Sequence, residues 1–380
     1  MEYVALKDVC KINMGQSPDS SSYNDKKEGI PFYQGNADFG EKHPIPRVWC
    51  NAPTKIAQPK DILMSVRAPI GALNYAQEKC CIGRGLAAIT PDKDKLSLEF
   101  LYWFLRGKNS ELNSKGTGST FKAISKKTLE EIRVPLIDLE KQQKMAQALE
   151  KTYSVIQMRT KQLKELDDLI KARFVELFGD PTENPNGYQI NRLSNYIISL
   201  TSGSRGWAKY CVNDGNEWFI TIKNVKDCSI ITDNMQPIKA PDNAEARRTK
   251  VKEGDLLISI TADLGRTGVV TKKIAEHGAY INQHLSCIRL DREVLNPLFV
   301  AHYMESPAGK EQFIAKNQSA VKAGLNFNSI KSLKLMIPPM EKQNEFEQFV
   351  HQIDKSKATV QKALDETQLL FDSLMQQYFG

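Results

Sequence analysis

Two separate stretches of this chain place apolar residues at alternating steps of three and four positions. The stretches cover residues 140–179 and 341–380. The apolar positions on the pattern are Met145, Leu149, Ile156, Leu163, Leu166, Ile170 and Leu177 in the first, and Phe346, Val350, Ile353, Val360, Leu364, Phe371, Leu374 and Tyr378 in the second. A stripe sustained over more than four heptads is typical of a coiled coil. No proline or glycine interrupts either stripe, so the pattern predicts two long helices.

The two stretches are copies of one another, because a shift of 201 positions brings them into register without a gap. Polar residues on one stripe correspond to apolar residues on the other. The pairs are Thr152 with Ile353, Lys357 with Ile156, Arg159 with Val360, Thr367 with Leu166 and Arg173 with Leu374. If each helix paired with a second copy of itself, its polar stripe residues would lie against each other and weaken the packing. We therefore expect the helices to pair with each other. The alternative is that the polar stripe residues only set the register of the coiled coil and do not indicate which helix is the partner. The stripe from Met145 to Leu177 would span about 48 Å, which suits a spacer.

The segments before the helices repeat more loosely. Residues 61–67 resemble residues 255–261, and residues 81–86 match residues 280–285. The offset drifts from 187 near the start to 201 at the helices, which places insertions and deletions in the loops of a shared fold. Short apolar runs predict strands at 61–66, 86–90, 255–260 and 285–290, and helical spacing appears at 98–105 and 298–304. The chain is thus a tandem duplication of a variable domain followed by a helix.

Composition is that of an ordinary soluble protein. The 380 residues suffice for two or three domains, and 41% are hydrophobic and 26% charged. No apolar run approaches the roughly 20 residues of a membrane span, and residues 1–7 lack the features of a signal peptide. We expect a cytoplasmic protein without membrane association. The seven cysteines have no metal-binding or disulfide-framework spacing, so we expect small buried hydrophobic residues.

The net basic excess lies outside the two copies of the helix taken together. The net charge of the chain is +7, whereas residues 140–179 carry +2 and residues 341–380 carry −3, which leaves +8 for the remaining sequence. A basic globular region in a cytoplasmic protein favours a polyanionic partner, most often nucleic acid.

Motifs of catalytic proteins are missing from the sequence. Gly309-Lys310 is followed by Glu311, so it is not a phosphate-binding loop, and Gly83-Arg84-Gly85 is best interpreted as a tight turn. The sequence has no Asn-Pro-Pro-aromatic tetrapeptide of the kind found in amino-methyltransferases, and its five histidines form no H-x-x-x-H motif. We therefore expect a recognition module with no catalytic residues and no bound metal.

Several strings, in this order, resemble the specificity (S) subunit of Type I restriction-modification enzymes. They are Ser65-Val66-Arg67-Ala68-Pro69-Ile70-Gly71, residues 118–125, Pro135-Leu136 leading into Glu140-Lys141-Gln142-Gln143, and Leu177-Phe178-Gly179-Asp180-Pro181. The resemblance implies an α+β protein with two mixed α/β target-recognition domains, residues 1–135 and 181–336. It also implies two conserved helices, residues 136–180 and 337–380, that form an antiparallel coiled coil and give the chain an internal pseudo-twofold repeat.

The same resemblance implies a non-catalytic subunit. Each recognition domain would read one half of a bipartite double-stranded DNA site with a fixed gap, and the chain would direct two methyltransferase (M) subunits and the restriction/motor (R) subunits to that site. S-adenosylmethionine, ATP and Mg would be bound by those partners, and this chain would carry no cofactor. Two alternatives stay open: a coiled-coil adapter with no role on DNA, and a stand-alone DNA-modifying enzyme.

Candidate DNA contacts are polar residues in loops between the repeated strands. They are Gln34, Asn36, Arg67, Arg84 and Lys122 in the first domain. The matching places in the second domain are, in the same order, Thr221, Asn224, Thr261, Gln283 and Lys322, with Arg266 beside Gly265. Arginine can bond to guanine O6 and N7, and glutamine or asparagine to adenine N6 and N7. The two lysines would meet phosphate, which positions without specifying. The alternative for each residue is a surface polar group without a role on DNA.

Overall fold

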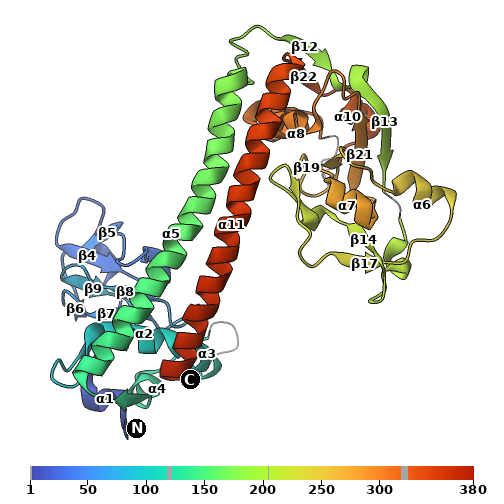
Figure 1. Cartoon of the computed structure of the whole chain (residues 1–380). Helices are drawn as coiled ribbons and strands as arrows, with labels where there is room; N and C mark the ends of the chain where they lie inside the picture. The colour runs from blue at the N-terminus through green and yellow to red at the C-terminus, as the bar shows by residue number, and fades with distance from the viewer. Residues whose placement is uncertain (1, 118–121, 204, 318–323) are drawn as a thin grey trace. The chain divides into compact units, whose positions relative to one another are not determined.

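The computed structural model describes residues 2–117, 122–203, 205–317 and 324–380. The chain forms two compact units. Unit 1 comprises Met1–Lys161 and Gln361–Gly380, and unit 2 comprises Gln162–Val360. Helix α5 (Leu139–Phe178) begins in unit 1 and ends in unit 2, whereas α11 (Met340–Phe379) begins in unit 2 and ends in unit 1. Both predicted long helices are thus confirmed, and each contributes one half to each unit (Figure 1).

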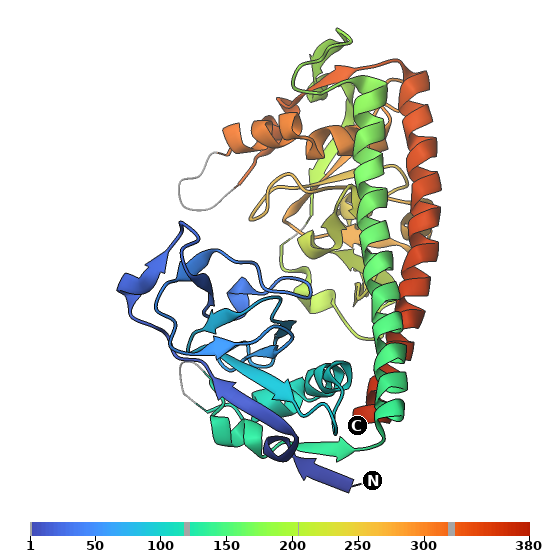
Figure 2. The ribbon, with the colours of Figure 1, turned by 90° about the vertical axis from the view of Figure 1, so that its left-hand side faces the viewer.

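Unit 1 is built mainly from short strands (Figure 2, blue and cyan). Its elements before α5 are β1 (Glu2–Ala5), α1 (Leu6–Val9), β2 (Cys10–Met14), β3 (Tyr23–Asn24), β4 (Ile30–Tyr33), β5 (Val48–Cys50), β6 (Ile56–Ala57), β7 (Ile62–Ser65), β8 (Leu73–Tyr75), β9 (Cys80–Ile82), β10 (Leu86–Pro91), α2 (Leu98–Gly107), α3 (Asn109–Ser114), α4 (Lys126–Glu130) and β11 (Arg133–Leu136). One sheet has the strand order β2-β10-β7-β8, a second has the order β3-β5-β4-β9-β6, and β1 pairs with β11.

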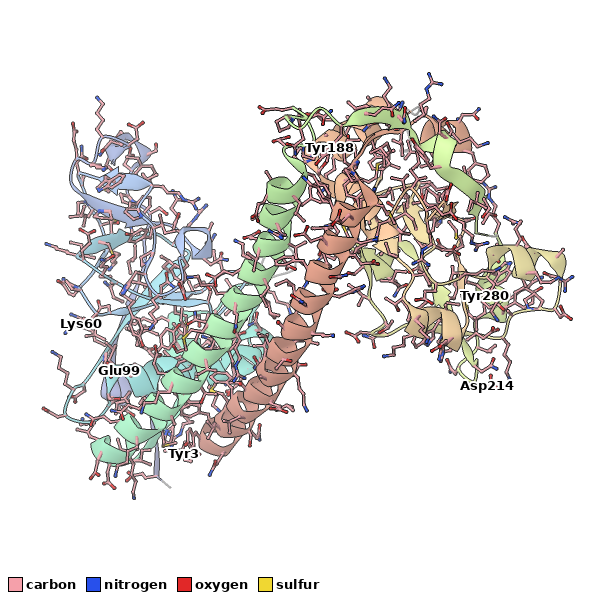
Figure 3. All side chains as sticks on the ribbon, turned by 45° about the horizontal axis from the view of Figure 1, so that its top comes forward. Tyr3, Lys60, Glu99, Tyr188, Asp214 and Tyr280 are labelled. Carbon is pink, nitrogen blue, oxygen red and sulfur yellow. The ribbon has the colours of Figure 1, made fainter. Side chains whose placement is uncertain are left out.

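Unit 2 repeats this plan with a smaller second sheet. Its elements between α5 and α11 are β12 (Gln189–Arg192), β13 (Ile197–Ser202), β14 (Glu217–Ile220), β15 (Val225–Lys226), β16 (Ser229–Ile230), β17 (Gln236–Ile238), α6 (Ala244–Thr249), β18 (Leu256–Ser259), β19 (Thr267–Val269), α7 (Lys272–His277), β20 (Ala279–Ile281), β21 (Leu285–Leu290), α8 (Pro297–Glu305), α9 (Pro307–Ala315), α10 (Phe327–Lys331) and β22 (Lys334–Ile337). The order β13-β21-β18-β19 matches that of the first sheet in unit 1, and the second sheet is β17-β14-β20. Tyr280 of β20, labelled in Figure 3, donates a hydrogen bond to Glu217 of β14 (3.0 Å).

The central strands are apolar on both faces because each face covers a different core. In unit 1, Ile62 and Ile89 are opposite each other in β7 and β10 and pack on the cluster that contains α2. Their neighbours Leu63 and Ala88 point the other way, into the cluster beneath the second sheet. This alternation follows from the two-residue period of a strand. It explains why these segments appear in the sequence as continuous apolar runs, and the predicted strands at these positions are confirmed.

The helices pair with each other within unit 1. Arg159 of α5 donates hydrogen bonds to the Ala363 carbonyl and to Thr367 Oγ1 (2.5 Å) of α11. The rings of Tyr153 and Phe371 are 5.8 Å apart. Two of the polar seam residues, Arg159 and Thr367, therefore satisfy one another.

Unit 2 shows the same antiparallel arrangement. Lys357 Nζ lies 2.6 Å from Asp167 Oδ1, and Arg173 Nη2 lies 2.6 Å from Glu345 Oε1. In each unit, α5 and α11 run in opposite directions, so residues later in α5 contact residues earlier in α11. The prediction that the two helices pair with each other is therefore confirmed. None of the helices in the part of the chain that the structure describes combines the length and the hydropathy of a membrane span.

The last turn of each long helix enters an aromatic core. Phe379 of α11 lies 5.4 Å from Phe100 and 5.7 Å from Phe104 in unit 1, measured between ring centroids. Its copy in α5, Phe178, lies 4.8 Å from Phe299 in unit 2. Burying one such side chain contributes about 1.5–3 kcal/mol to stability. Residues 361–380 thus complete the core of unit 1, although all of unit 2 precedes them in the sequence.

A glutamine near the start of each long helix is buried completely. Gln142 Oε1 accepts a hydrogen bond from the Ser97 N–H (2.8 Å), and Gln142 Nε2 donates to the carbonyls of Lys95 and Ile137 (both 2.8 Å). Gln343, the copy in α11, makes the same set of three bonds in unit 2. The repeated Glu-Lys-Gln string therefore marks an anchor between helix and domain.

Six of the seven cysteines are buried. Burial raises the pKa of the Cys10 and Cys80 thiols to about 12, and burial likewise raises the pKa of Cys228 and Cys287. These thiols stay protonated at neutral pH and act as packing groups, as the sequence predicts.

We expect unit 2 to lose stability in mild acid because of one histidine. His302 of α8 lies edge-on to Phe346, with ring centroids 5.0 Å apart. Burial and the positive charge of Lys357 lower the pKa of His302 to about 4, whereas the unfolded value is about 6.5. Below pH 6.5 the unfolded chain binds a proton that the folded chain excludes. The free energy of unfolding should therefore fall by up to about 1.4 kcal/mol per pH unit, or about 2 kcal/mol between pH 6.5 and 5.

The measurement is urea unfolding from pH 7.5 to 5, with His302→Gln beside the wild type. The variant has no titrating ring at this position, so its stability should fall less steeply with acid. His351→Gln is the control, because the side chain of His351 is 61% exposed, and it should keep the wild-type slope. An unchanged slope in His302→Gln would refute this cause.

Candidate nucleic-acid interface

Each unit has an open pocket, lined by both polar and apolar residues, where its parallel strand pair ends. In unit 1 the parallel strands are β4 and β9, and in unit 2 they are β14 and β20. The unit 1 pocket is lined by Phe32, Gln34, Gly35, Asn36, Ala37, Asp38, Val48, Arg67, Ala68 and Gly85. The unit 2 pocket is lined by Thr221, Ile222, Lys223, Asn224, Asn234, Gln236, Thr261, Ala262, Asn282 and His284.

The same backbone contact ends the parallel pair in both units. The carbonyl of Tyr33, the last residue of β4, accepts a hydrogen bond from the Gly83 N–H (2.8 Å). The carbonyl of Ile220, the last residue of β14, accepts one from the Asn282 N–H (3.0 Å). The two pockets therefore begin at equivalent points of the repeat.

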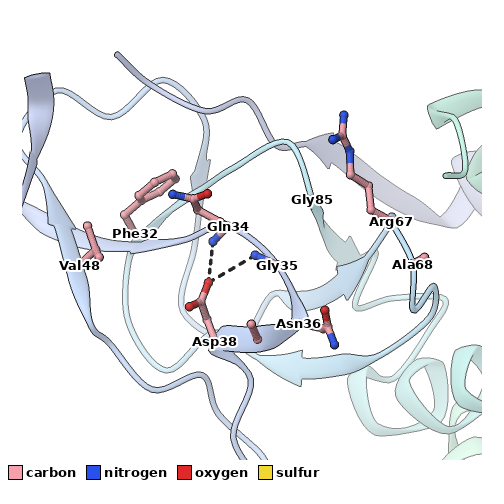
Figure 4. Close-up of a pocket in the computed structure, with 10 residues that line it drawn as sticks. Phe32, Gln34, Gly35, Asn36, Asp38, Val48, Arg67, Ala68 and Gly85 are labelled. Carbon is pink, nitrogen blue, oxygen red and sulfur yellow. Dashed lines mark hydrogen bonds between the residues drawn. The ribbon is translucent and has the colours of Figure 1, made fainter. Parts of the chain in front are cut away.

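Beyond β4 the chain makes one turn of 3-10 helix, η2 (Asn36–Asp38). The side chain of its last residue, Asp38, closes this turn. Asp38 Oδ2 accepts hydrogen bonds from the N–H groups of Gln34 (2.7 Å) and Gly35 (3.3 Å). Figure 4 shows both bonds as dashed lines. The carboxylate thus fixes the segment that forms one wall of the pocket.

Beyond β14 the corresponding turn is η5 (Ile222–Asn224), and Asn224 closes it. Asn224 Oδ1 accepts hydrogen bonds from Thr221 N–H (2.9 Å) and Thr221 Oγ1 (2.8 Å). Asn224 therefore takes the place of Asp38. The sequence comparison matched Asn224 with Asn36, and the structure corrects this. Between strand and closing residue, unit 1 has residues 34–37 and unit 2 has only residues 221–223, so Asp38 and Asn224 correspond.

The loops after β7 and β18 form the facing wall. Arg67 forms an isolated antiparallel bridge with Ala123, and Thr261 forms the same bridge with Gly324. The matching of Arg67 with Thr261 is therefore confirmed by the structure. In these two loops the same backbone position carries an arginine in unit 1 and a threonine in unit 2.

A glycine fixes the path of each of these loops. Gly265 has φ +78°, and a Cβ atom there would lie 2.3 Å from the ring of Phe313. Gly71 has φ +87°, and a Cβ atom there would lie 2.7 Å from the side chain of Asn109. Both positions need the left-handed conformation and the absence of a side chain. The repeated glycine thus indicates a loop shape that both units share.

In unit 1 the structure brings together three of the five candidate residues. Gln34 and Asn36 follow β4, and Arg67 lies on the facing loop (Figure 4). The Arg67 guanidinium forms no hydrogen bond or ion pair with any residue that the structure describes, so its donors are available. Arg84 and Lys122 are exposed but do not line the pocket.

In unit 2 the pocket collects Thr221, Asn224 and Thr261. Gln283 does not line the pocket. Arg266 Nε donates a hydrogen bond to Asp263 Oδ2 (2.5 Å), so this carboxylate partly neutralises the charge of Arg266. The remaining candidate, Lys322, lies outside the described residues.

Several lining residues were not predicted. They are Asp38 in unit 1 and Lys223, Asn234, Gln236, Asn282 and His284 in unit 2. His284 Nδ1 lies 2.8 Å from Thr261 Oγ1, and His284 Nε2 lies 3.1 Å from Gln283 Nε2. The matched strings 81–86 and 280–285 place His284 opposite Gly85, so the sequence did carry a signal for it.

A side chain fits at position 284 but not at position 85. A Cβ atom on Gly85 would lie 2.2 Å from the Gln34 carbonyl oxygen. In unit 2 the matching position carries His284, which lines the pocket. The functional group in this part of the pocket therefore comes from Arg67 in unit 1 and from the Thr261–His284 pair in unit 2.

The two pockets differ in charge as well as in shape. In unit 1 the lining residues include Arg67 and Asp38, whereas in unit 2 they include Lys223 and no carboxylate. Amide, guanidinium, hydroxyl and carboxylate groups are the donors and acceptors that match the edges of base pairs. Among the described residues, no group of three or more His, Cys, Asp or Glu side chains could hold a metal ion.

Comparison with known proteins gives consistent results. The family model for the Type I restriction modification DNA specificity domain matches residues 1–168 and 216–367. The chain is 21% identical over 415 residues to the Type I restriction enzyme EcoBI specificity subunit of Escherichia coli, which covers 99% of this chain and 85% of that relative. It is 45% identical over 157 residues to a protein named as the MjaX specificity subunit of Methanocaldococcus jannaschii, covering 41% of this chain and 37% of that relative.

Solved structures agree on the fold. The S subunit of a Type I restriction-modification system from M. genitalium is similar with a TM-score of 0.64 at 13% identity, covering 100% of this chain and 96% of that one. A chain from work on complex assembly and conformational transition of the type I R-M system is similar with a TM-score of 0.57 at 18% identity, covering 100% and 97%. Since the family model matches more than half of this chain, in two segments, the chain belongs to the family of Type I restriction-modification DNA specificity proteins.

Proposed function

We propose that this chain is the non-catalytic specificity subunit of a Type I restriction-modification complex and that each unit reads one half of a bipartite DNA site. The observation that carries the proposal is the pair of equivalent pockets. One strand-and-turn frame recurs in both units, and different polar side chains line it. A shared frame approaches DNA in the same way twice, whereas different side chains read different bases.

The charge distribution supports a nucleic-acid partner. The sequence outside the two helix copies carries a net charge of +8. Basic side chains on the recognition units supply phosphate contacts, whose strength falls with salt concentration. An adapter with no role on DNA would have no need for this excess. Salt-dependent binding of duplex DNA therefore separates the two functions.

We further propose a division of labour in the complex. The chain positions two methyltransferase subunits and the restriction subunits at the site, and those partners bind S-adenosylmethionine, ATP and Mg. The names of the relatives, which are specificity subunits, support this role. The alternative of a stand-alone DNA-modifying enzyme requires methylation or cleavage by the purified chain alone.

The proposed function is tested by mapping methylation across the genome of a host that expresses this chain with its methyltransferase partner. We expect a split motif with a constant gap, which disappears when this chain is deleted. Unchanged methylation after deletion would contradict the proposal and favour the adapter.

We expect Arg67→Ala to relax discrimination at one base pair in the half-site read by unit 1. Arg67 lines the pocket and its guanidinium has no partner among the described residues, so it can bond guanine O6 and N7. The loss should be about 1–3 kcal/mol at that one position. The measurement is selection from a pool of duplexes randomised over the half-site.

Lys122→Ala is the matched control for Arg67→Ala. Lys122 precedes Ala123, the bridge partner of Arg67, and the Lys122 carbonyl accepts a hydrogen bond from the Ala68 N–H (3.0 Å). Its exposed side chain does not line the pocket, so we expect a uniform loss of affinity and a shallower salt dependence. A uniform loss from Arg67→Ala as well would assign Arg67 to phosphate instead.

A further inference from the structure

The residue that closes the turn beside each pocket has two polar side-chain atoms, and one of them accepts the hydrogen bonds that close the turn. The residue is Asp38 in unit 1 and Asn224 in unit 2, and both line their pockets. The second atom is the one available to a ligand. Its chemistry differs between the units.

In unit 1 the second atom is an acceptor. Asp38 Oδ2 is occupied by the N–H groups of Gln34 and Gly35. Asp38 Oδ1 makes no hydrogen bond with the described residues, and Figure 4 shows it on the side away from those two amides. An ionised carboxylate can only accept hydrogen bonds.

In unit 2 the second atom is a donor. Asn224 Oδ1 faces the Thr221 N–H, which can only donate, so the orientation of the amide is fixed by its partner. The amide nitrogen is left, and within the described residues its contact is the Ile231 carbonyl at 3.4 Å, near the outer limit for a hydrogen bond. The Asn224 Nδ2 group can therefore donate to a ligand.

Closing the turn requires an acceptor atom but not a negative charge. Asn224 shows that a neutral side chain closes this turn. A carboxylate beside the pocket repels the phosphates of any DNA sequence and so weakens binding in general. It becomes favourable when the DNA presents a hydrogen-bond donor to it, because aspartate accepts from the amino group of a base.

We propose that this position selects one base in each half-site: Asp38 accepts from the amino group of cytosine or adenine, and Asn224 donates to the carbonyl of guanine or thymine. The inference rests on the proposed function and deepens it. It assigns the reading of hydrogen-bond polarity to the turn-closing position, whose residue in unit 1, Asp38, was not among the sequence candidates.

The experiment exchanges the two residues in the full chain, co-expressed with its methyltransferase partner, and maps the methylated motif. Asp38→Asn introduces the residue that unit 2 already uses, so the turn keeps its closing bonds. At one position of the unit 1 half-site, we expect the preference to shift by roughly tenfold or more from an amino-bearing to a carbonyl-bearing base. The unit 2 half-site should stay unchanged. Asn224→Asp should produce the opposite shift in the unit 2 half-site alone.

The outcomes separate the inference from the function on which it rests. A wild-type chain that yields no split motif would overturn the proposed function. A wild-type split motif that neither exchange alters would overturn the inference alone, as would a uniform change of methylation at all sites. If Asp38→Asn fails to fold by thermal melting, Asn224→Asp decides the question, and failure of both to fold would show that the position is structural only.

Discussion

Replacement of Gln142 by leucine should lower the free energy of unfolding of unit 1 by about 3–5 kcal/mol. Leucine is similar in size and apolar, so the site stays filled. The Ser97 N–H and the carbonyls of Lys95 and Ile137, however, lose their partner. A buried polar group left without a partner costs about 1–3 kcal/mol, and three such groups relax only in part. Urea unfolding monitored by circular dichroism measures the loss.

The chain supplies its own control, since Gln143 is the next residue and is exposed. Gln143→Leu should change stability by less than about 0.5 kcal/mol. Equal effects of the two substitutions would show that the buried bonds do not stabilise the unit.

Gln343→Leu should reproduce the Gln142→Leu effect in unit 2. There, the Asn296 N–H (2.8 Å) and the carbonyls of Val294 (3.0 Å) and Pro338 (2.8 Å) are the groups left unpaired.

Arg289→Ala should destabilise unit 2 by about 3 kcal/mol. Asp255 is fully buried, and Arg289 binds it through two bonds, Nε to Oδ1 (2.8 Å) and Nη2 to Oδ2 (2.7 Å). Removing the guanidinium leaves a buried carboxylate whose remaining donors, among the residues that the structure describes, are the Lys252 N–H (2.8 Å) and the Cys287 thiol (3.3 Å). The Arg289 side chain is 34% exposed, so water offsets part of the loss and the value is at the low end for a broken buried pair.

Arg289→Thr tests whether the loss comes from the missing donor. The equivalent position in unit 1 is Thr90, whose Oγ1 donates to Asp61 Oδ1 (2.6 Å). Threonine at 289 should therefore restore at least about 1 kcal/mol relative to alanine. If both variants melt together, a hydroxyl donor does not substitute for the guanidinium, and the explanation by hydrogen bonding is wrong.

The long helices could be predicted from the sequence because a heptad stripe is a local signal that needs no knowledge of the rest of the fold. The strands could be predicted for a similar reason, since runs such as Ile62–Ser65 are apolar on both faces. The pairing of polar seam residues could not. Arg159 bonds to Thr367, and neither residue's own repeat copy indicates that partner. That contact depends on the antiparallel register, which only the packed structure specifies.

The candidate site was predicted where the two copies keep the same length. Arg67 and Thr261 follow matched strands and lie on matched loops. The prediction failed where one copy is a residue shorter, which hid the correspondence of Asp38 with Asn224. His284 was not predicted because the matching residue in the other copy is Gly85, which has no side chain from which to infer chemistry.

The exchange of helix ends between the units has a consequence for how the chain folds during its synthesis on the ribosome. Unit 2 is continuous in sequence, from Gln162 to Val360, whereas unit 1 includes residues 361–380. The ribosome therefore synthesises all of unit 2 before it makes Phe371 and Phe379, which close the aromatic core of unit 1. The first domain to emerge is the last to be completed, and until then its unfilled core is a surface on which chaperones can act.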